Sequence, residues 1–131
     1  MRSVHISLGS RSYDILIGSA VAVDEVLPTT GLGRGVAVIV TNTTIAALHL
    51  PRIRSALGHA FARVEVVELP DGEEFKTWGS LNQILTALLG WGCDRNTVLF
   101  ALGGGVVGDV TGFAAATYMR GIPFVQLPTT L

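Results

Sequence analysis

Cysteine is almost absent from this 131-residue sequence, in which Cys93 is the only one. A single cysteine excludes an intrachain disulfide. The first residues, 1–5, also lack the charged-then-apolar layout of a secretory signal. We therefore expect a protein of the reducing cytoplasm, with Cys93 as an ordinary thiol.

Charge and metal ligands are scarce as well. Charged residues make up 15% of the sequence and the formal net charge is −1, so the electrostatic basis for binding nucleic acid or an anionic membrane surface is missing. No apolar run approaches the roughly 18 residues that a membrane span needs. His5, His49 and His59 are far apart and lack the spacing of zinc ligands, so we expect no metal site made by this chain alone.

Apolar residues, in contrast, make up 49% of the sequence, and the length suits one compact domain. Short β-rich runs alternate with segments of helical periodicity, which predicts an α/β fold with a mostly parallel sheet covered by helices. An antiparallel hairpin is expected beside this sheet, from two short runs joined by a polar link. The expected hairpin strands are 3–8 and 13–18, the sheet strands 36–40, 63–69, 97–102 and 124–127, and the helices 45–57, 74–89 and 110–119.

Two places interrupt this pattern. Pro51 lies inside the 45–57 helix and can split it, because proline removes an internal donor and clashes with the preceding turn. At the other end, residues 124–131 form a strand followed at once by a turn. We therefore expect residues 1–131 to be one domain of a longer protein that continues beyond Leu131.

Gly103, Gly105 and Gly108 satisfy the spacing G-x-G-x-x-G between a buried strand and a helix. Such a turn can present backbone N–H groups and a helix dipole to a pyrophosphate. The usual dinucleotide fingerprint lies on the first strand, with an acidic residue about 20 residues later that holds the ribose. Here the turn comes late and no acid lies about 20 residues after it, so the glycines fit either a different nucleotide arrangement or close packing.

Asp109 and Lys76 each fit two roles. Asp109 follows the last glycine, where a carboxylate can cap the helix or accept a hydrogen bond from a ligand hydroxyl. Lys76, the only lysine, follows a strand end in a loop suited to ligands. The pattern slightly favours a surface pair with Glu73, three residues earlier on a helix.

Asn42, Thr44 and Arg120 are also ambiguous. Asn42 and Thr44 can contact a ribose or cap the following helix, and capping is the commoner role. Arg120 can pair with a phosphate through its planar guanidinium, or with the C-terminus of a helix. Spacing alone does not separate these roles.

Three strings taken together resemble 3-dehydroquinate synthase: LPDGEEFK at 69–76, ALGGGVVGDVTGFAAATYMRG at 101–121 and FVQLPTTL at 124–131. The resemblance implies a Rossmann-like NAD-binding fold, and it assigns contacts only where residues match. It implies cofactor contacts at Asn42 and Thr44 (adenosine side), Glu73 and Lys76 (nucleotide loop), Gly104, Gly105 and Asp109 (pyrophosphate and ribose), and Thr129 and Thr130. It also implies that Arg120 reaches the substrate phosphate of the partner subunit in a homodimer.

The family reaction converts 3-deoxy-D-arabino-heptulosonate 7-phosphate to 3-dehydroquinate and phosphate with NAD and a divalent metal, zinc or cobalt. Family members are more than twice this long, and their metal ligands lie in a C-terminal helical domain that this chain lacks. The resemblance therefore implies a cofactor-binding fragment that is inactive alone. The alternatives are another sugar phosphate cyclase, such as a 2-deoxy-scyllo-inosose or 2-epi-5-epi-valiolone synthase, a glycerol dehydrogenase relative, or a non-catalytic nucleotide-binding module.

Overall fold

The computed structural model describes residues 1–18 and 23–130. It contains a four-stranded sheet in the order β4-β3-β5-β6, in which all neighbouring strands run parallel. The bounds are β1 Arg2–Ile6, β2 Tyr13–Ile17, α1 Val23–Thr30, β3 Arg34–Asn42, α2 Thr43–Gly58, β4 Phe61–Leu69, α3 Trp78–Gly90, β5 Val98–Gly103, α4 Gly105–Thr117 and β6 Phe124–Pro128. The predicted α/β class is confirmed.

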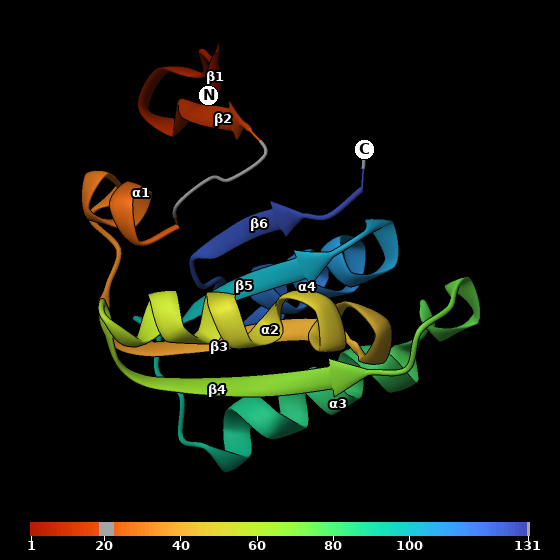
Figure 1. Ribbon diagram of the computed structural model, residues 1–131. Coiled ribbons are helices and arrows are strands. Elements are labelled where there is room, and N and C mark those ends of the chain that lie inside the picture. Colours follow the sequence, from red (N-terminus) through yellow and green to blue (C-terminus); the bar gives the residue numbers. More distant parts are fainter. Residues whose placement is uncertain (19–22, 131) are drawn as a thin grey trace.

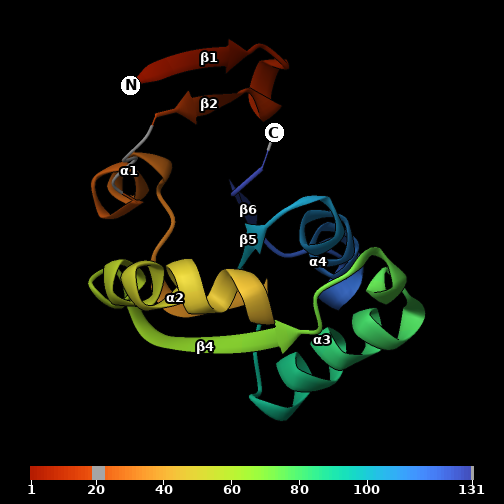
Figure 2. The same ribbon diagram turned by 45° about the vertical axis from the view of Figure 1, so that its right-hand side comes forward.

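Helices cover both faces of the sheet, as Figures 1 and 2 show for α2 and α3 on opposite sides of β4. Side chains of α1 and α2 pack on one face, and side chains of α3 and α4 pack on the other. The central strand β3 contributes to both cores, since Val38 and Val40 belong to the α3–α4 core while Ala37 and Ile39 belong to the α1–α2 core. Successive strand residues face opposite sides, so a strand buried on both faces reads as a continuous apolar run.

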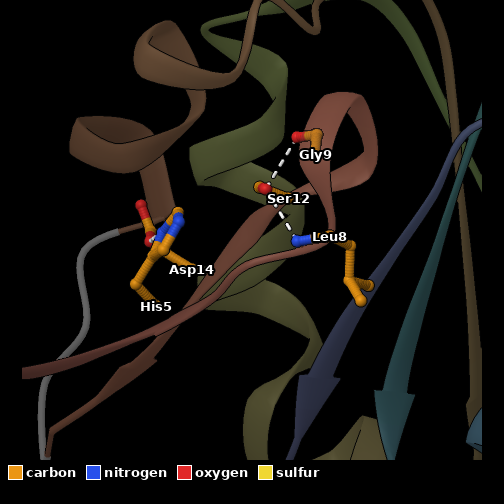
Figure 3. Close-up of polar contacts among 5 residues, drawn as sticks. All are labelled: His5, Leu8, Gly9, Ser12 and Asp14. Atoms are coloured by element: carbon orange, nitrogen blue, oxygen red, sulfur yellow. Dashed lines mark hydrogen bonds and ion pairs between the residues drawn. The ribbon is translucent and has the colours of Figure 1, made fainter.

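The N-terminal hairpin is confirmed as antiparallel, but it forms a sheet of its own and does not extend an edge of the main sheet. Both ribbon views place it away from the β4-β3-β5-β6 layer. Figure 3 shows its polar contacts: His5 Nδ1 lies 2.7 Å from Asp14 Oδ1 on the opposite strand, and Ser12 Oγ donates to the Gly9 carbonyl at 2.7 Å. The amide of Leu8 donates to Ser12 Oγ at 2.9 Å, which fixes the connection.

Pro51 does not split the helix, as its position allowed, and α2 continues through it. Asn42 caps this helix by accepting a hydrogen bond from the Ile45 amide at 2.8 Å. Ala46 before the proline and Ile53 after it are both buried. Packing on the sheet therefore holds both halves of the helix in line despite the lost donor.

Two predicted helix starts are wrong. Helix α3 begins at Trp78 and not at residue 74, because the Thr77 hydroxyl accepts from the Ser80 amide at 3.2 Å and sets a later start. Residues Glu73–Phe75 form a separate 3₁₀ turn, η2. Helix α4 begins at Gly105, before the predicted residue 110, since the buried Val107 anchors its first turn in the core. No helix in the described part of the chain is long and apolar enough to cross a membrane.

Adjacent leucines on α3 test this packing with matched variants. Leu88 is fully buried in the core, whereas Leu89 is 67% exposed. We expect Leu88→Ala to lower the free energy of unfolding by about 2–5 kcal/mol, because it removes buried methyl groups and leaves a cavity. Leu89→Ala should change it by less than about 0.5 kcal/mol. Urea unfolding followed by circular dichroism measures both, and equal losses would contradict the assigned helix face.

Candidate functional site

The carboxyl ends of the four parallel strands lie at one edge of the sheet. From β3 the chain passes through α2 to β4, whereas from β5 it passes through α4 to β6 on the other side. The connections of the neighbouring strands β3 and β5 therefore diverge. Such a topological switch point is where open α/β sheets bind ligands.

Two hollows open at this edge and share Gly104 and Gly105. We call them the β3–β4 pocket and the β5–β6 pocket after the strand ends that border them. The β3–β4 pocket is lined by Asn42, Leu69, Pro70, Asp71, Gly72, Glu73, Gly104, Gly105, Val106 and Val107. The β5–β6 pocket is lined by Ala101, Gly103, Gly104, Gly105, Gly108, Asp109, Gln126, Pro128 and Thr130. The two pockets thus meet at the glycine turn.

The turn combines glycines that are closely packed with one that faces open space. Gly103 has φ +158°, and a Cβ there would lie 3.0 Å from the Val107 side chain, so this glycine permits close packing. A Cβ on Gly105 would meet nothing within 4 Å, so this residue faces open space. Gly104, the residue before the helix, would bring a Cβ to 3.2 Å from Thr130 Oγ1. Packing explains Gly103 and Gly104, whereas Gly105 leaves backbone accessible to a ligand.

Helix α4 begins at this turn without a side-chain cap. Asn42 caps α2 and Thr77 caps α3, but Gly104 offers no side chain to the first amides of α4. The first N–H groups of any α-helix lack partners within the helix, and they carry the positive end of its dipole. Gly105, Val106 and Val107, which carry such groups, line the β3–β4 pocket. This helix start has the chemistry of an anion site.

An ion pair joins the loop after β4 to α4. Lys76 Nζ lies 2.6 Å from Asp109 Oδ2, and both side chains are about half exposed. The hydrogen bond and the charge of Asp109 raise the pKa of Lys76, and the charge of Glu73 raises that pKa to a smaller extent. The favoured Glu73–Lys76 surface pair is therefore wrong, as the Lys76 side chain points to Asp109. Asp109 is also not a helix cap, because it is the fifth residue of α4.

The carboxylate of Asp71 links the two segments that follow β3 and β4. Asn42 Nδ2 donates to Asp71 Oδ1 at 3.3 Å, and Thr44 Oγ1 donates to Asp71 Oδ2 at 2.7 Å. The capping role of Asn42 is confirmed, whereas the Thr44 hydroxyl binds Asp71 in place of capping the helix. Asp71 was not among the predicted site residues, although it lies in the 69–76 string. An Asp-Gly sequence is typical of a turn, so the sequence did not indicate that the Asp71 carboxylate takes part in the site.

The two threonines after β6 reach the same edge. The Thr129 amide donates to the Gly103 carbonyl at 3.1 Å, and its buried hydroxyl oxygen has no hydrogen-bond partner among the described residues. Thr130 lines the β5–β6 pocket. The nine predicted cofactor residues therefore lie at the carboxyl end of β3 or on the segments that follow the four strands.

Arg120 lies elsewhere. It belongs to a 3₁₀ turn, η3 (Tyr118–Arg120), beyond the other end of α4, and its side chain is exposed. The 13 residues of α4 span about 20 Å, so Arg120 does not share the pockets of the glycine turn. Within residues 1–18 and 23–130, no group of three or more His, Cys, Asp or Glu side chains is arranged to hold a metal ion.

Lys76 is the only lysine, so its titration can be followed without assignment ambiguity. We expect Asp109→Asn to lower the pKa of Lys76 towards the ordinary value of 10.5, because the largest causes of its elevation disappear. Carbon-13 NMR of the lysine Cε measures this pKa directly. Glu74→Gln, which removes a charge from the same loop, should leave most of the elevation in place. A pKa that Asp109→Asn does not change would refute the pair in solution.

The sign of the pH dependence follows from this elevation. A lysine whose pKa is raised by folding stabilises the folded state below its unfolded pKa, near 10.5, and this contribution is lost as the pH rises through the folded pKa. The ion pair is therefore intact at neutral pH. Because both partners are exposed, salt should screen it.

Comparison with known proteins identifies the family. The family model described as 3-dehydroquinate synthase N-terminal matches residues 66–131, about half of the chain. The 3-dehydroquinate synthases of Nitrosomonas europaea and Nitrosospira multiformis are 50% and 51% identical to this chain over its full length. That of Teredinibacter turnerae is 48% identical. The chain spans only 36–37% of the length of these relatives.

Solved structures show the same fold. A 2-deoxy-scyllo-inosose synthase superposes with a TM-score of 0.86 at 24% identity, over 98% of this chain and 36% of that protein. The 2-epi-5-epi-valiolone synthase of Streptomyces hygroscopicus subsp. jinggangensis, which has NAD+ and Zn2+ bound, gives 0.77 at 26% identity, over 95% and 34%. A glycerol dehydrogenase of Schizosaccharomyces pombe is less similar, with a TM-score of 0.57 at 20% identity, over 77% and 24%. With this fold, and with a family model that covers the 69–76 loop, the glycine turn and the last strand, the chain belongs to the 3-dehydroquinate synthase N-terminal family.

Proposed function

We propose that residues 1–131 form the NAD-binding domain of a longer cytoplasmic enzyme that converts 3-deoxy-D-arabino-heptulosonate 7-phosphate to 3-dehydroquinate and phosphate. The identity of about 50% to 3-dehydroquinate synthases over the whole of this chain, which spans 37% of their length, supports this reaction. The observation that carries the cofactor assignment is the uncapped start of α4 at the switch point between β3 and β5. A dinucleotide needs an anion site for its pyrophosphate and a pocket on each side for its two nucleosides. The start of α4 and the two pockets beside it meet this need.

The residues present fit NAD. The first amides of α4, at Gly105 and its neighbours, would hold the pyrophosphate, since no side chain competes for them. Asn42 and Glu73 in the β3–β4 pocket would border the adenosine half. Asp109 and Thr130 in the β5–β6 pocket would border the nicotinamide half. The bound cofactor supplies a reversible hydride transfer at a ring alcohol of the substrate, and the domain supplies binding and orientation.

Lys76 connects the two halves electrostatically. Its ammonium group is held at Asp109, on the first turns of α4, from a loop that borders the other pocket. A cation beside the glycine turn favours a pyrophosphate there, because charge-assisted hydrogen bonds are the strong ones. Asp109 in turn keeps carboxylate oxygen available for a ribose hydroxyl.

The rest of the site lies outside this chain in our proposal. The valiolone synthase has Zn2+ bound and another 2-deoxy-scyllo-inosose synthase structure holds carbaglucose-6-phosphate, NAD+ and Co2+. We place a divalent zinc or cobalt ion, and most of the sugar phosphate site, on the remainder of the longer protein. Arg120 would meet the substrate phosphate of the partner subunit in a homodimer, which its distance from the glycine turn supports. The fragment alone should then be inactive, and phosphate release by it with added metal would overturn this statement.

A second candidate is another sugar phosphate cyclase activity, which the TM-score of 0.86 to 2-deoxy-scyllo-inosose synthase favours. Its identity to this chain is 24%, against 50% for the 3-dehydroquinate synthase of Nitrosomonas europaea. Comparing the two sugar phosphates as substrates of the longer protein would separate the candidates. We place the 3-dehydroquinate reaction first.

Calorimetric titration with NAD tests the cofactor assignment. We expect the chain to bind NAD, and Asp109→Ala and Lys76→Ala to weaken binding by about tenfold or more, because each removes a charged hydrogen-bonding group from the cleft. Arg95→Ala is a suitable control, since Arg95 lies in the loop before β5, at the opposite edge of the sheet. Absence of binding by the unaltered chain would remove the cofactor claim.

A further inference from the structure

The turn η3 holds two consecutive residues in the left-handed backbone conformation. Met119 has φ 47° and Arg120 has φ 65°, and neither is a glycine. Such residues adopt this conformation at a cost in free energy, so it persists only where the surrounding structure imposes it. Met119 is 45% exposed and the Arg120 side chain is exposed too. Burial of these two side chains therefore does not offset the cost.

The residues on either side of this pair impose the conformation. Tyr118 is buried, and its hydroxyl donates to the Cys93 carbonyl, in the loop after α3, at 2.6 Å. Ile122 is also buried, and its amide donates to the Ala115 carbonyl of α4 at 2.9 Å. The Gly121 amide closes the turn on the Tyr118 carbonyl at 2.8 Å. The chain is thus fixed immediately before and after the two left-handed residues.

A fixed turn determines where the Arg120 side chain leaves the backbone. Within residues 1–18 and 23–130, the Arg120 guanidinium has no hydrogen bond or ion pair, so its donors are available to an external anion. We propose that Tyr118 is a positioning residue, whose hydrogen bond to the Cys93 carbonyl holds η3 so that Arg120 is presented to the substrate phosphate. This inference rests on the proposed function, in which Arg120 meets that phosphate, and it adds the group that sets the direction of Arg120.

Tyr118 has the chemistry that a permanent anchor needs. Burial is the main cause that raises the pKa of Tyr118, so the hydroxyl stays protonated and remains a donor throughout the neutral range. Its acceptor is itself held, because the Cys93 amide donates to the Leu88 carbonyl of α3 at 3.0 Å. The anchor therefore extends from the turn to a helix of the core. An arginine on a fixed turn loses less conformational freedom when it binds an anion.

Steady-state kinetics of the longer protein, with the sugar phosphate as substrate, tests this role. Tyr118→Phe removes the hydroxyl and keeps the ring. We expect it to raise the KM for the sugar phosphate about three- to tenfold, the range of one lost hydrogen bond, and to leave the Kd for NAD unchanged. The inhibition constant of inorganic phosphate, the product, should rise by a similar factor. Tyr13→Phe alters the only other tyrosine, which is exposed in the hairpin, and should change neither constant.

An Arg120→Ala background separates positioning from a general effect on folding. There Tyr118→Phe should raise the KM no further, because the group that it positions is gone. Should Tyr118→Phe fail to fold, Met119→Gly tests the same turn, since glycine keeps the left-handed conformation accessible but frees the backbone. It should also raise the KM for the sugar phosphate.

Two kinds of failure are distinguishable. If Arg120→Ala leaves the KM for the sugar phosphate unchanged, or if the longer protein does not turn this substrate over, the proposed function fails and the inference falls with it. If Arg120→Ala raises this KM but Tyr118→Phe lowers only kcat or the melting temperature, the inference alone is overturned. Additive effects of the two substitutions on KM would overturn it as well, because Tyr118 would then act independently of Arg120.

Discussion

The functional edge of this domain depends on the unpaired amides in the first turn of α4. They arise because Gly104 gives the helix no side-chain cap, whereas Asn42 and Thr77 cap the two helices before it. The strand order places this uncapped start at the switch point, with a pocket on either side. The Lys76–Asp109 ion pair then joins the loop after β4 to the same helix. Together these features form the anion site that we propose at the start of α4.

The fold could be predicted where burial follows a simple period. The run at 36–40 alternates between two cores, and Leu81, Ile84 and Leu88 of α3 share one face, so strand and helix patterns identified these elements. Helix starts could not be placed as well, since the Thr77 cap and the packing of Val107 decide them. Helix α1 (Val23–Thr30) was missed, because its Pro28 and two threonines are typical of a loop.

The candidate site was predicted as a set of residues but not as a network. Sequence spacing predicted Glu73, three residues away, as the partner of Lys76. The observed partner is Asp109 on α4, which comes close to Lys76 only in the folded chain. Asp71 was hidden for the same reason, as its donors Asn42 and Thr44 are 29 and 27 residues away in sequence. Arg120 shows the converse, since it is near the glycine turn in sequence but beyond the far end of α4.

The central claim is that the start of α4 binds the pyrophosphate of NAD. Proton–nitrogen NMR of the labelled chain tests it most directly, because each backbone amide reports separately. On addition of NAD, the account predicts the largest shifts at Gly105, Val106 and Val107, with little change at Met119 and Arg120 beyond the other end of the helix. Shifts concentrated in η3, or no shift at Gly105–Val107 at saturating NAD, would contradict it.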